Sequence, residues 1–310
     1  MSAEKINVPA FAKINLGLRV HGRRPDGYHE ISTVFQTVSL RDTLSFQATP
    51  GEKLELACSD PTIPSDESNL VLRAASALRE RFGVSRGARV VLEKVIPAGG
   101  GLGGGSANAA VTLAALATLW GIETGAGELA EIGARLGADV PFFLTGGMAL
   151  GTGTGTDIRP LEDAPKMHLV IVTPGVRVST AGAYGALGAP ALTKVEPLVN
   201  LSVSRTEADF PDSLCGLWSN DFEAVVVRLH PEIGRAREAL AGAGARRVML
   251  SGSGSSVFGV FDNKREAARA RGVLKAEGGW RVFACETLTR AEYLAALGRV
   301  AAALLPGGGA

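Results

Sequence analysis

Six glycines fall within residues 99–105, and an Ala- and Leu-rich helical pattern follows them directly. Glycine turns freely through positive φ and lets the backbone come within hydrogen-bonding distance of a ligand. The first turn of a helix adds unpaired N–H groups and the positive end of the helix dipole. The segment therefore predicts a phosphate site rather than a linker, because a linker would not lie directly between a strand and an uninterrupted apolar helix.

Two familiar phosphate loops do not fit this segment. Gly99, Gly101 and Gly104 match the spacing of a dinucleotide site, which also needs an acidic residue about 20 positions later, at the end of a second strand. The nearest acid, Glu123, follows a helical pattern with no strand between. A Walker A loop is excluded because the chain contains no Gly-Lys dipeptide. We expect a phosphate loop of a third type.

Four other side chains are candidates for chemistry near this loop. Lys13 and Asn15 alternate with aliphatic residues, so in a strand they point to the face opposite the aliphatic one. Tyr28 and His29 follow the turn sequence Pro-Asp-Gly and are expected in a loop. Taken singly, such a lysine is usually solvated and such loop residues usually have no special role.

The local sequence around Asp139 and at residues 251–255 allows two explanations for each. Asp139 precedes Val140 and Pro141, which is typical of a residue that caps a short helix, but it could instead supply a reactive carboxylate. Residues 251–255, Ser-Gly-Ser-Gly-Ser, lie between two strand patterns. They could bring more N–H and hydroxyl donors to the same anion, or they could form an ordinary hairpin turn.

The elements that must position these residues alternate between strand and helix. In the first half the periodicity predicts strands over 4–57, a helix at 68–82, a strand at 88–95, a helix from the loop to about 119 and a helix ending at 137. Ser68 or Asp66 should cap the first helix, and Gly83 should end it. In the second half it predicts strands at 169–172, 248–250, 257–261 and 281–284, and helices at about 214–229, 232–241 and 264–276.

This pattern is typical of an α+β protein with two domains. Residues 146–156 are rich in glycine and threonine, so we place the domain boundary there and expect domains at 1–155 and 156–310. A chain of 310 residues with 46% hydrophobic residues can build two cores.

Composition and charge limit the possible partners. A net charge of +1 gives no reason to expect a nucleic acid or an anionic membrane, so the partner should be a small molecule. The three cysteines are far apart and the histidines have no ligand spacing, so we expect neither disulfides nor a metal site built by the protein. With no signal segment and no apolar stretch of membrane-spanning length, the expected location is the cytoplasm.

Taken together, five segments resemble the GHMP kinases: residues 9–16 (PAFAKINL), 25–29 (PDGYH), 97–108, 137–143 (GADVPFF) and 251–255 (SGSGS). The resemblance implies a two-domain fold, with a ribosomal protein S5 domain 2-like N-terminal domain, a ferredoxin-like C-terminal domain and the active site between them. It also implies ATP and Mg²⁺ as cofactors, a small-molecule acceptor and a monomer or homodimer.

The segments 12–16 and 26–29 are similar to those of family members whose acceptor is a cytidyl diphosphate sugar alcohol. Members that phosphorylate homoserine or mevalonate would lack a cytosine pocket, so Tyr28 and His29 argue against them. A nicotinamide-dependent oxidoreductase would need the missing strand and acid. A non-catalytic nucleotide sensor would not need Lys13 together with Asp139.

The resemblance also implies roles for individual residues. Lys13 and Asp139 would be catalytic, with Asp139 as the base and the positive charge of Lys13 favouring its ionised form. The residues expected to bind ATP are Asn69 and Lys94 at the adenine, with Pro97, Ala98, Gly99, Gly100, Gly101, Leu102, Gly103, Gly104, Gly105, Ser106 and Ala107 around the phosphates and Ser106 also near Mg²⁺. The residues expected to bind the acceptor are Asn15, Tyr28, His29, Thr180 and Tyr184, with Tyr184 standing where the family often has phenylalanine.

Overall fold

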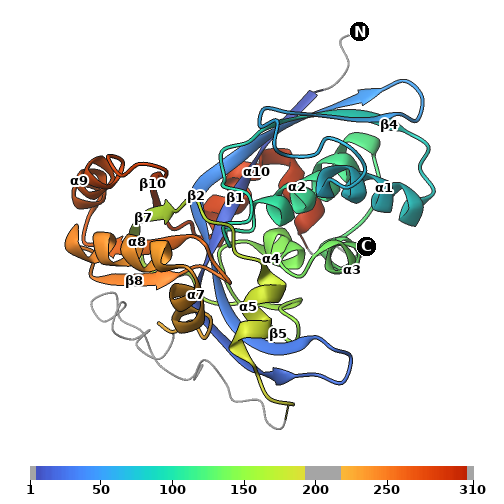
Figure 1. Ribbon diagram of the computed structural model, residues 1–310. Helices are drawn as coiled ribbons and strands as arrows, with labels where there is room; N and C mark the ends of the chain where they lie inside the picture. The colour runs from blue at the N-terminus through green and yellow to red at the C-terminus, as the bar shows by residue number, and fades with distance from the viewer. Residues whose placement is uncertain (1–4, 193–217, 306–310) are drawn as a thin grey trace.

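The computed structural model describes residues 5–192 and 218–305, and these form two β-sheets with helices packed on them (Figure 1). The expected α+β class is confirmed. The larger sheet has the strand order β3-β4-β2-β5-β6, with β1 paired to β2, and the smaller has the order β10-β7-β9-β8. The strands are β1 (Lys5–Arg23), β2 (His29–Thr49), β3 (Leu54–Cys58), β4 (Gly87–Glu93), β5 (Met148–Thr152), β6 (Asp157–Pro160), β7 (His168–Thr173), β8 (Arg247–Leu250), β9 (Val257–Phe261) and β10 (Arg281–Glu286).

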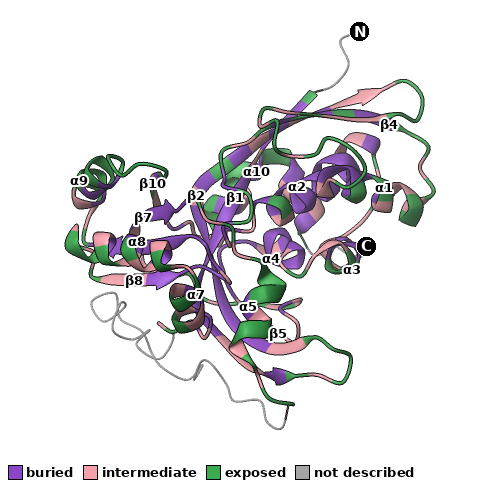
Figure 2. Ribbon diagram, in the orientation of Figure 1, coloured by how far each residue is buried: buried purple, intermediate pink, exposed green. Residues whose placement is uncertain are grey.

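The long antiparallel pair β1 and β2 connects the two sheets. Ile6 and Val8 of β1 belong to a hydrophobic cluster that includes α1 and α2, whereas Ile14 and Leu16 belong to a second cluster with residues of β7 and β9. Leu18 reaches a third cluster built mainly from the second half of the chain. The β1–β2 register shifts between Phe11 and Ala12 and again after Asn15, which lets the strands bend between the two sheets. Figure 2 shows the buried middle of both strands.

Four helices complete the first cluster: α1 (Leu70–Phe82), which lies between β3 and β4 in the chain, and α2 (Gly104–Trp120), α3 (Ala126–Leu136) and α4 (Val140–Thr145), which follow β4. The predicted cap of the first helix is wrong. Asn69 is the N-cap, and its side chain accepts a hydrogen bond from the Val71 N–H at 2.9 Å. The Asp66 carboxylate instead accepts bonds from Ser68, so it stabilises the turn before the helix. Gly83 ends the helix with φ of 63°, as predicted.

The second half places helices on its four-stranded sheet: α5 (Thr180–Leu187), α7 (Glu223–Leu229), α8 (Pro231–Gly242) and α9 (Lys264–Leu274). A helix was predicted at about 214–229. Its last part is α7, and its first residues, 214–217, lie outside the described ranges. Helix α5 was not predicted, because Gly182 and Gly185 lower its helix propensity. The Ser179 side chain caps it by accepting a bond from Gly182 N–H at 3.2 Å.

The segment rich in glycine and threonine forms a hairpin. β5 and β6 pair with each other and β5 pairs with β2, so the first sheet continues to Pro160 and the second begins at His168. The chain then returns after β10, because α10 (Arg290–Leu297) and the 3₁₀ helix η2 (Gly298–Leu304) pack on the first cluster. The division of the chain at 155/156 stays a prediction. No helix in residues 5–192 or 218–305 is long and apolar enough to cross a membrane.

Candidate active site

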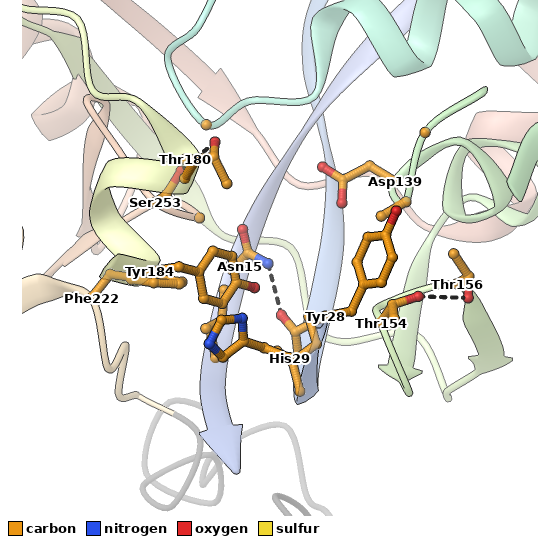
Figure 3. Close-up of a pocket in the computed structure, with 18 of the residues that line it drawn as sticks. Asn15, Tyr28, His29, Asp139, Thr154, Thr156, Thr180, Tyr184, Phe222 and Ser253 are labelled. Carbon is orange, nitrogen blue, oxygen red and sulfur yellow. Dashed lines mark hydrogen bonds between the residues drawn. The ribbon is translucent and has the colours of Figure 1, made fainter. Parts of the chain in front are cut away.

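A cavity of about 1100 Å³ lies over the second half of β1 and the beginning of β2 (Figure 3). Its other walls come from the junction of α3 and α4, the β5–β6 turn, helix α5 and the loop between β8 and β9. Residues from both halves of the chain therefore enclose one space. Of the predicted catalytic and acceptor-binding residues, the cavity is lined by Lys13, Asn15, Tyr28, His29, Asp139, Thr180 and Tyr184, which is the whole set.

The two predicted catalytic side chains meet in this cavity. Lys13 Nζ lies 3.4 Å from Asp139 Oδ2, and the lysine side chain is 4% exposed whereas the aspartate is 32% exposed. Lys13 Nζ also donates to Asn15 Oδ1 at 2.7 Å, and Asn15 Nδ2 donates to Thr33 Oγ1 at 2.7 Å. These bonds fix the orientation of the ammonium group, and the more exposed carboxylate remains open to the cavity.

Asp139 occupies the N-cap position of α4, but its side chain makes no capping hydrogen bond. Of the two explanations for this residue, the capping role therefore does not hold. Pro141 near the start of the helix has no N–H to be capped, which reduces the need for a side-chain acceptor. The carboxylate turns instead toward Lys13 and the cavity, as Figure 3 shows for Asp139.

The glycine loop connects β4 to α2 and is packed closely on its surroundings. Gly99, Gly101 and Gly103 have φ of 69°, 76° and 70°, which only glycine adopts without strain. The Lys13 N–H donates to the Leu102 carbonyl at 3.0 Å, so the loop is tied to β1. A side chain at Gly103 would come within 2.7 Å of the Phe143 ring. Among the predicted phosphate-binding residues, Gly101 and Gly103 line the cavity itself.

The second loop, residues 251–256, contacts the first. Ser251 Oγ donates to the Gly101 carbonyl at 3.0 Å, and Ser256 N–H donates to the Gly100 carbonyl at 3.0 Å. Gly252 lies beside the ammonium group of Lys13 and also lines the cavity. The loop is thus both the connection of the β8–β9 hairpin and a wall of the site. Asn220, which sequence reasoning missed, holds it by donating to the Gly252 carbonyl at 2.8 Å.

The side chains of His29, Tyr184 and Phe222 line one end of the cavity. The His29 ring stacks on Tyr184 with centroids 4.4 Å apart, and Tyr184 meets Phe222 edge-on at 4.8 Å. Tyr28 is 67% exposed, and its ring points into the cavity toward the side of Asp139 (Figure 3). Phe222 was missed because the pattern predicted it inside a helix at about 214–229, whereas it lies at the N-cap of α7.

Burial shifts the pKa values of two of these rings. Burial, and then the positive charge of Arg23, lower the pKa of His29. Burial, and then the negative charge of Asp139, raise the pKa of Tyr184 to about 12. At neutral pH both rings are therefore uncharged and offer apolar faces for stacking.

The two predicted adenine-binding residues lie beside the glycine loop but do not line this cavity. Lys94 Nζ is 2.8 Å from Asp42 Oδ2, and a side chain at Gly104 would come within 3.1 Å of it. Burial lowers the pKa of Lys94. Asn69, the cap of α1, is next to Leu70, which faces Gly105. Their contact with adenine stays a prediction.

Asp42 is a buried residue that sequence reasoning missed. Its Oδ1 accepts bonds from the N–H groups of Val95 and Ile96, both at 2.7 Å, and its Oδ2 pairs with Lys94. One carboxylate thus fixes three successive residues before the glycine loop. Its neighbours in sequence give no sign that a single acid in a strand is fully buried.

Ser106 lies near the α3–α4 junction, since a side chain at Gly137 would come within 3.7 Å of its hydroxyl.

Two pairs of hydroxyl groups line the acceptor side of the cavity: Thr180 Oγ1 lies 3.1 Å from Ser253 Oγ, and Thr154 Oγ1 lies 3.2 Å from Thr156 Oγ1. In the described ranges no three His, Cys, Asp or Glu side chains gather as they would around a metal ion.

A glycine loop opening a helix, a lysine–carboxylate pair and a cavity for an acceptor define a small-molecule phosphotransferase. Comparison with known proteins supports this class of enzyme. The family model of the GHMP kinases N terminal domain matches residues 69–147, and that of the GHMP kinases C terminal domain matches residues 202–279. The chain belongs to the GHMP kinase family, whose members use ATP as the phosphoryl donor.

Its relatives include more specific members of this family. Proteins of Prosthecochloris aestuarii and Syntrophotalea carbinolica, both named 4-diphosphocytidyl-2-C-methyl-D-erythritol kinase, are each 42% identical over 88% and 89% of this chain and 95% and 96% of their own. A crystal structure of 4-(cytidine 5'-diphospho)-2C-methyl-D-erythritol kinase superposes with a TM-score of 0.74 at 36% identity, over 91% of this chain and 99% of that one. A homoserine kinase from Cytophaga hutchinsonii, at 18% identity and a TM-score of 0.66, shares the fold.

Proposed function

We propose that this kinase transfers the γ-phosphoryl group of ATP to the 2-hydroxyl of 4-diphosphocytidyl-2-C-methyl-D-erythritol, a step of the non-mevalonate route to isoprenoid precursors. The observation that carries the proposal is that His29, Tyr184 and Tyr28 lie in the same cavity as the Lys13–Asp139 pair. A pyrimidine base can stack there while the other end of the substrate reaches the carboxylate. The names of relatives at 42% identity support the same substrate.

In the proposed reaction Asp139 accepts the proton of the 2-hydroxyl as its oxygen attacks the γ-phosphorus. The new oxygen–phosphorus bond forms while the bond to the leaving ADP oxygen breaks. Lys13, 3.4 Å from the carboxylate, holds a positive charge at the site and offsets the negative charge on the transferred group. Because the transition state of phosphoryl transfer is loose, Asp139 also serves to orient the hydroxyl.

The backbone N–H groups of the glycine loop and of the first turn of α2 bind the phosphates. Positive φ values at Gly101 and Gly103 give the loop a tight backbone path that only glycine follows without strain. The described residues fit Mg²⁺ of the usual kinase type, which binds through phosphates and one or two protein oxygens rather than a protein cage. Ser106 would supply such an oxygen, and the ion would neutralise charge on the β- and γ-phosphates.

The acceptor-side residues divide the substrate between them. Tyr28, His29 and Tyr184 bind the cytosine, while Asn15 and Thr180 hold the polyol near Asp139. The His29 and Tyr184 rings stack with centroids 4.4 Å apart, so a base that stacks on Tyr184 must displace His29 or stack on the outer side of the pair. We also expect a cytoplasmic enzyme that acts as a monomer or homodimer.

A coupled assay of ADP release tests this proposal. The purified protein is offered ATP and Mg²⁺ with the cytidyl substrate, with homoserine or with mevalonate. We expect turnover with the cytidyl substrate alone. Turnover of homoserine or mevalonate in its place would overturn the specificity, and no ADP release with any of the three would overturn the acceptor class.

A further inference from the structure

Two arginines that line the cavity, Arg23 and Arg135, have no side-chain partner among the residues that the structure describes. The charged side chains of the cavity other than His29 are Lys13, Arg23, Asp26, Arg135 and Asp139. Lys13 pairs with Asp139, and Asp26 pairs with Arg24 at 3.1 Å. Within residues 5–192 and 218–305, the guanidinium groups of Arg23 and Arg135 form no hydrogen bond or ion pair. Two positive charges are therefore left over on the wall of a site that takes an anionic substrate.

These arginines lie toward opposite ends of the cavity. Arg23 ends β1 and is the register partner of His29, and its charge contributes to the lowered pKa of that histidine. It is therefore close to the aromatic end. Arg135 lies in the last turn of α3, four residues before Asp139 at the N-cap of α4, so it is close to the end where the proposed phosphoryl transfer takes place.

The proposed substrate has a matching order of parts. Its cytidine is at one end, its polyol is at the other, and a diphosphate with two negative charges joins them. Guanidinium groups bind phosphate oxygens through two parallel hydrogen bonds, which gives both strength and a fixed orientation. Neither arginine must give up a partner among the described residues to do so.

We propose that Arg23 and Arg135 bind the diphosphate of the acceptor, Arg23 at the phosphate attached to cytidine and Arg135 at the phosphate attached to the polyol. This assignment rests on the proposed function. It explains how a cavity with an exposed opening distinguishes a nucleoside diphosphate from a nucleoside. Both residues act by binding substrate and not in the chemical step.

The test measures the affinities of cytidine, CMP and CDP by calorimetry for the wild-type protein and for Arg23→Gln and Arg135→Gln. Wild-type protein should bind the three with increasing affinity. Arg23→Gln should remove the gain from cytidine to CMP, and Arg135→Gln the gain from CMP to CDP, each by about tenfold or more, as expected for a hydrogen bond to a charged group. The matched control is Arg265→Gln, an exposed arginine of α9 outside the cavity, which should leave all three affinities unchanged.

Three outcomes overturn the proposal: unchanged ratios of affinity in both variants, an equal loss for cytidine itself, or a higher KM for ATP in place of weaker CDP binding. The first would mean that the arginines are solvated, the second that they act through packing, and the third that they serve the nucleotide donor. Failure of the proposed function is a separate result, because it requires that the wild-type protein not turn over the cytidyl substrate. If the arginine assignment alone is wrong, the wild-type protein still turns over the cytidyl substrate.

Discussion

At the scale of single residues, the site depends on a cation and a carboxylate that differ in exposure. Lys13 is nearly buried, with its ammonium group held by Asn15 and Asp139, so it cannot move far from the place where phosphoryl transfer would occur. Asp139 is about one-third exposed and can meet an acceptor hydroxyl. Burial holds the Lys13 ammonium group in place, and exposure leaves the Asp139 carboxylate accessible to the acceptor.

Replacing Asp139 by Asn removes the proposed base and keeps its shape. General-base catalysis typically contributes about 10²–10⁴ in rate, so kcat should fall at least about a hundredfold while the affinity for ATP changes little. Steady-state kinetics with the cytidyl substrate and a nucleotide-binding measurement check this. Nearly full turnover in Asp139→Asn would remove the residue from the chemical step.

His29 should titrate below the ordinary histidine value of 6.5, because burial and Arg23 disfavour its charged form. As pH falls, the unfolded chain takes up this proton first. The contribution of His29 to the free energy of unfolding is therefore fully present above about pH 6.5 and declines as the pH falls below it. An NMR titration should give a midpoint under 6.5 for the signal that disappears in His29→Gln, and Arg23→Gln should raise that midpoint. A midpoint at or above 6.5 would contradict the burial of the ring.

At the scale of elements, two loops from different sheets make one wall. The glycine loop belongs to the first half and residues 251–256 to the second, and they touch through Gly100, Gly101 and Ser251. Asp42 fixes the residues before the first loop, and Asn220 fixes the second. The contact needs glycine where the two backbones approach, because any side chain would fill the gap.

Gly101 and Gly99 form a matched pair for testing this contact. Both have positive φ, so alanine costs a similar backbone strain of about 1 kcal/mol at either position. A side chain at Gly101 would overlap the Ser251 carbonyl oxygen, whereas one at Gly99 meets nothing within 4 Å. Gly101→Ala should therefore lose both stability and kcat/KM, measured by chemical unfolding and the coupled assay. Gly99→Ala should show the strain alone, and equal effects of the two changes would mean that the loop contact is unimportant.

At the scale of the whole molecule, the two halves share their cores. β1 passes through three hydrophobic clusters, and α10 returns from the end of the second sheet to the first cluster. Tyr293 of α10 is 1% exposed, contacts the Phe11 ring and donates a hydrogen bond to the Phe143 carbonyl. The cavity walls are therefore held by packing that joins distant parts of the chain.

Tyr293→Ala should destabilise the whole protein, because it leaves a large cavity in the first cluster. The expected loss in the free energy of unfolding is about 3–5 kcal/mol. Tyr293→Phe keeps the ring and removes the hydrogen bond, so its loss should be about 1 kcal/mol. Denaturant unfolding followed by circular dichroism measures both. If Tyr293→Ala unfolds like the wild-type protein, α10 does not contribute to the first cluster.

Much of the fold could be predicted because it is encoded locally. Strand and helix periodicity located β1, β2, α1 to α3 and most of the second sheet, and Gly83 correctly marked the end of α1. Predictions failed where two local signals compete. Asn69, Ser68 and Asp66 are all good caps, and only the path of the chain decided that Asn69 accepts the bond from Val71. The turn-rich segment after α4 contains the β5–β6 hairpin of the first sheet, and the domain boundary placed in it stays a prediction.

The sequence alone determined the kind of chemistry: a glycine run before a helix for phosphate, and a lysine, an aspartate and aromatic residues as candidate partners. These features depend on backbone freedom and residue type, which are local properties. Only the tertiary structure decided that Lys13 is nearly buried beside a more exposed Asp139, that Asp42 is buried before the glycine loop and that His29 stacks on Tyr184. It also decided that, within residues 5–192 and 218–305, the guanidinium groups of Arg23 and Arg135 form no hydrogen bond or ion pair. Such contacts depend on strand pairing and core packing between residues far apart in the chain, and no local pattern encodes them.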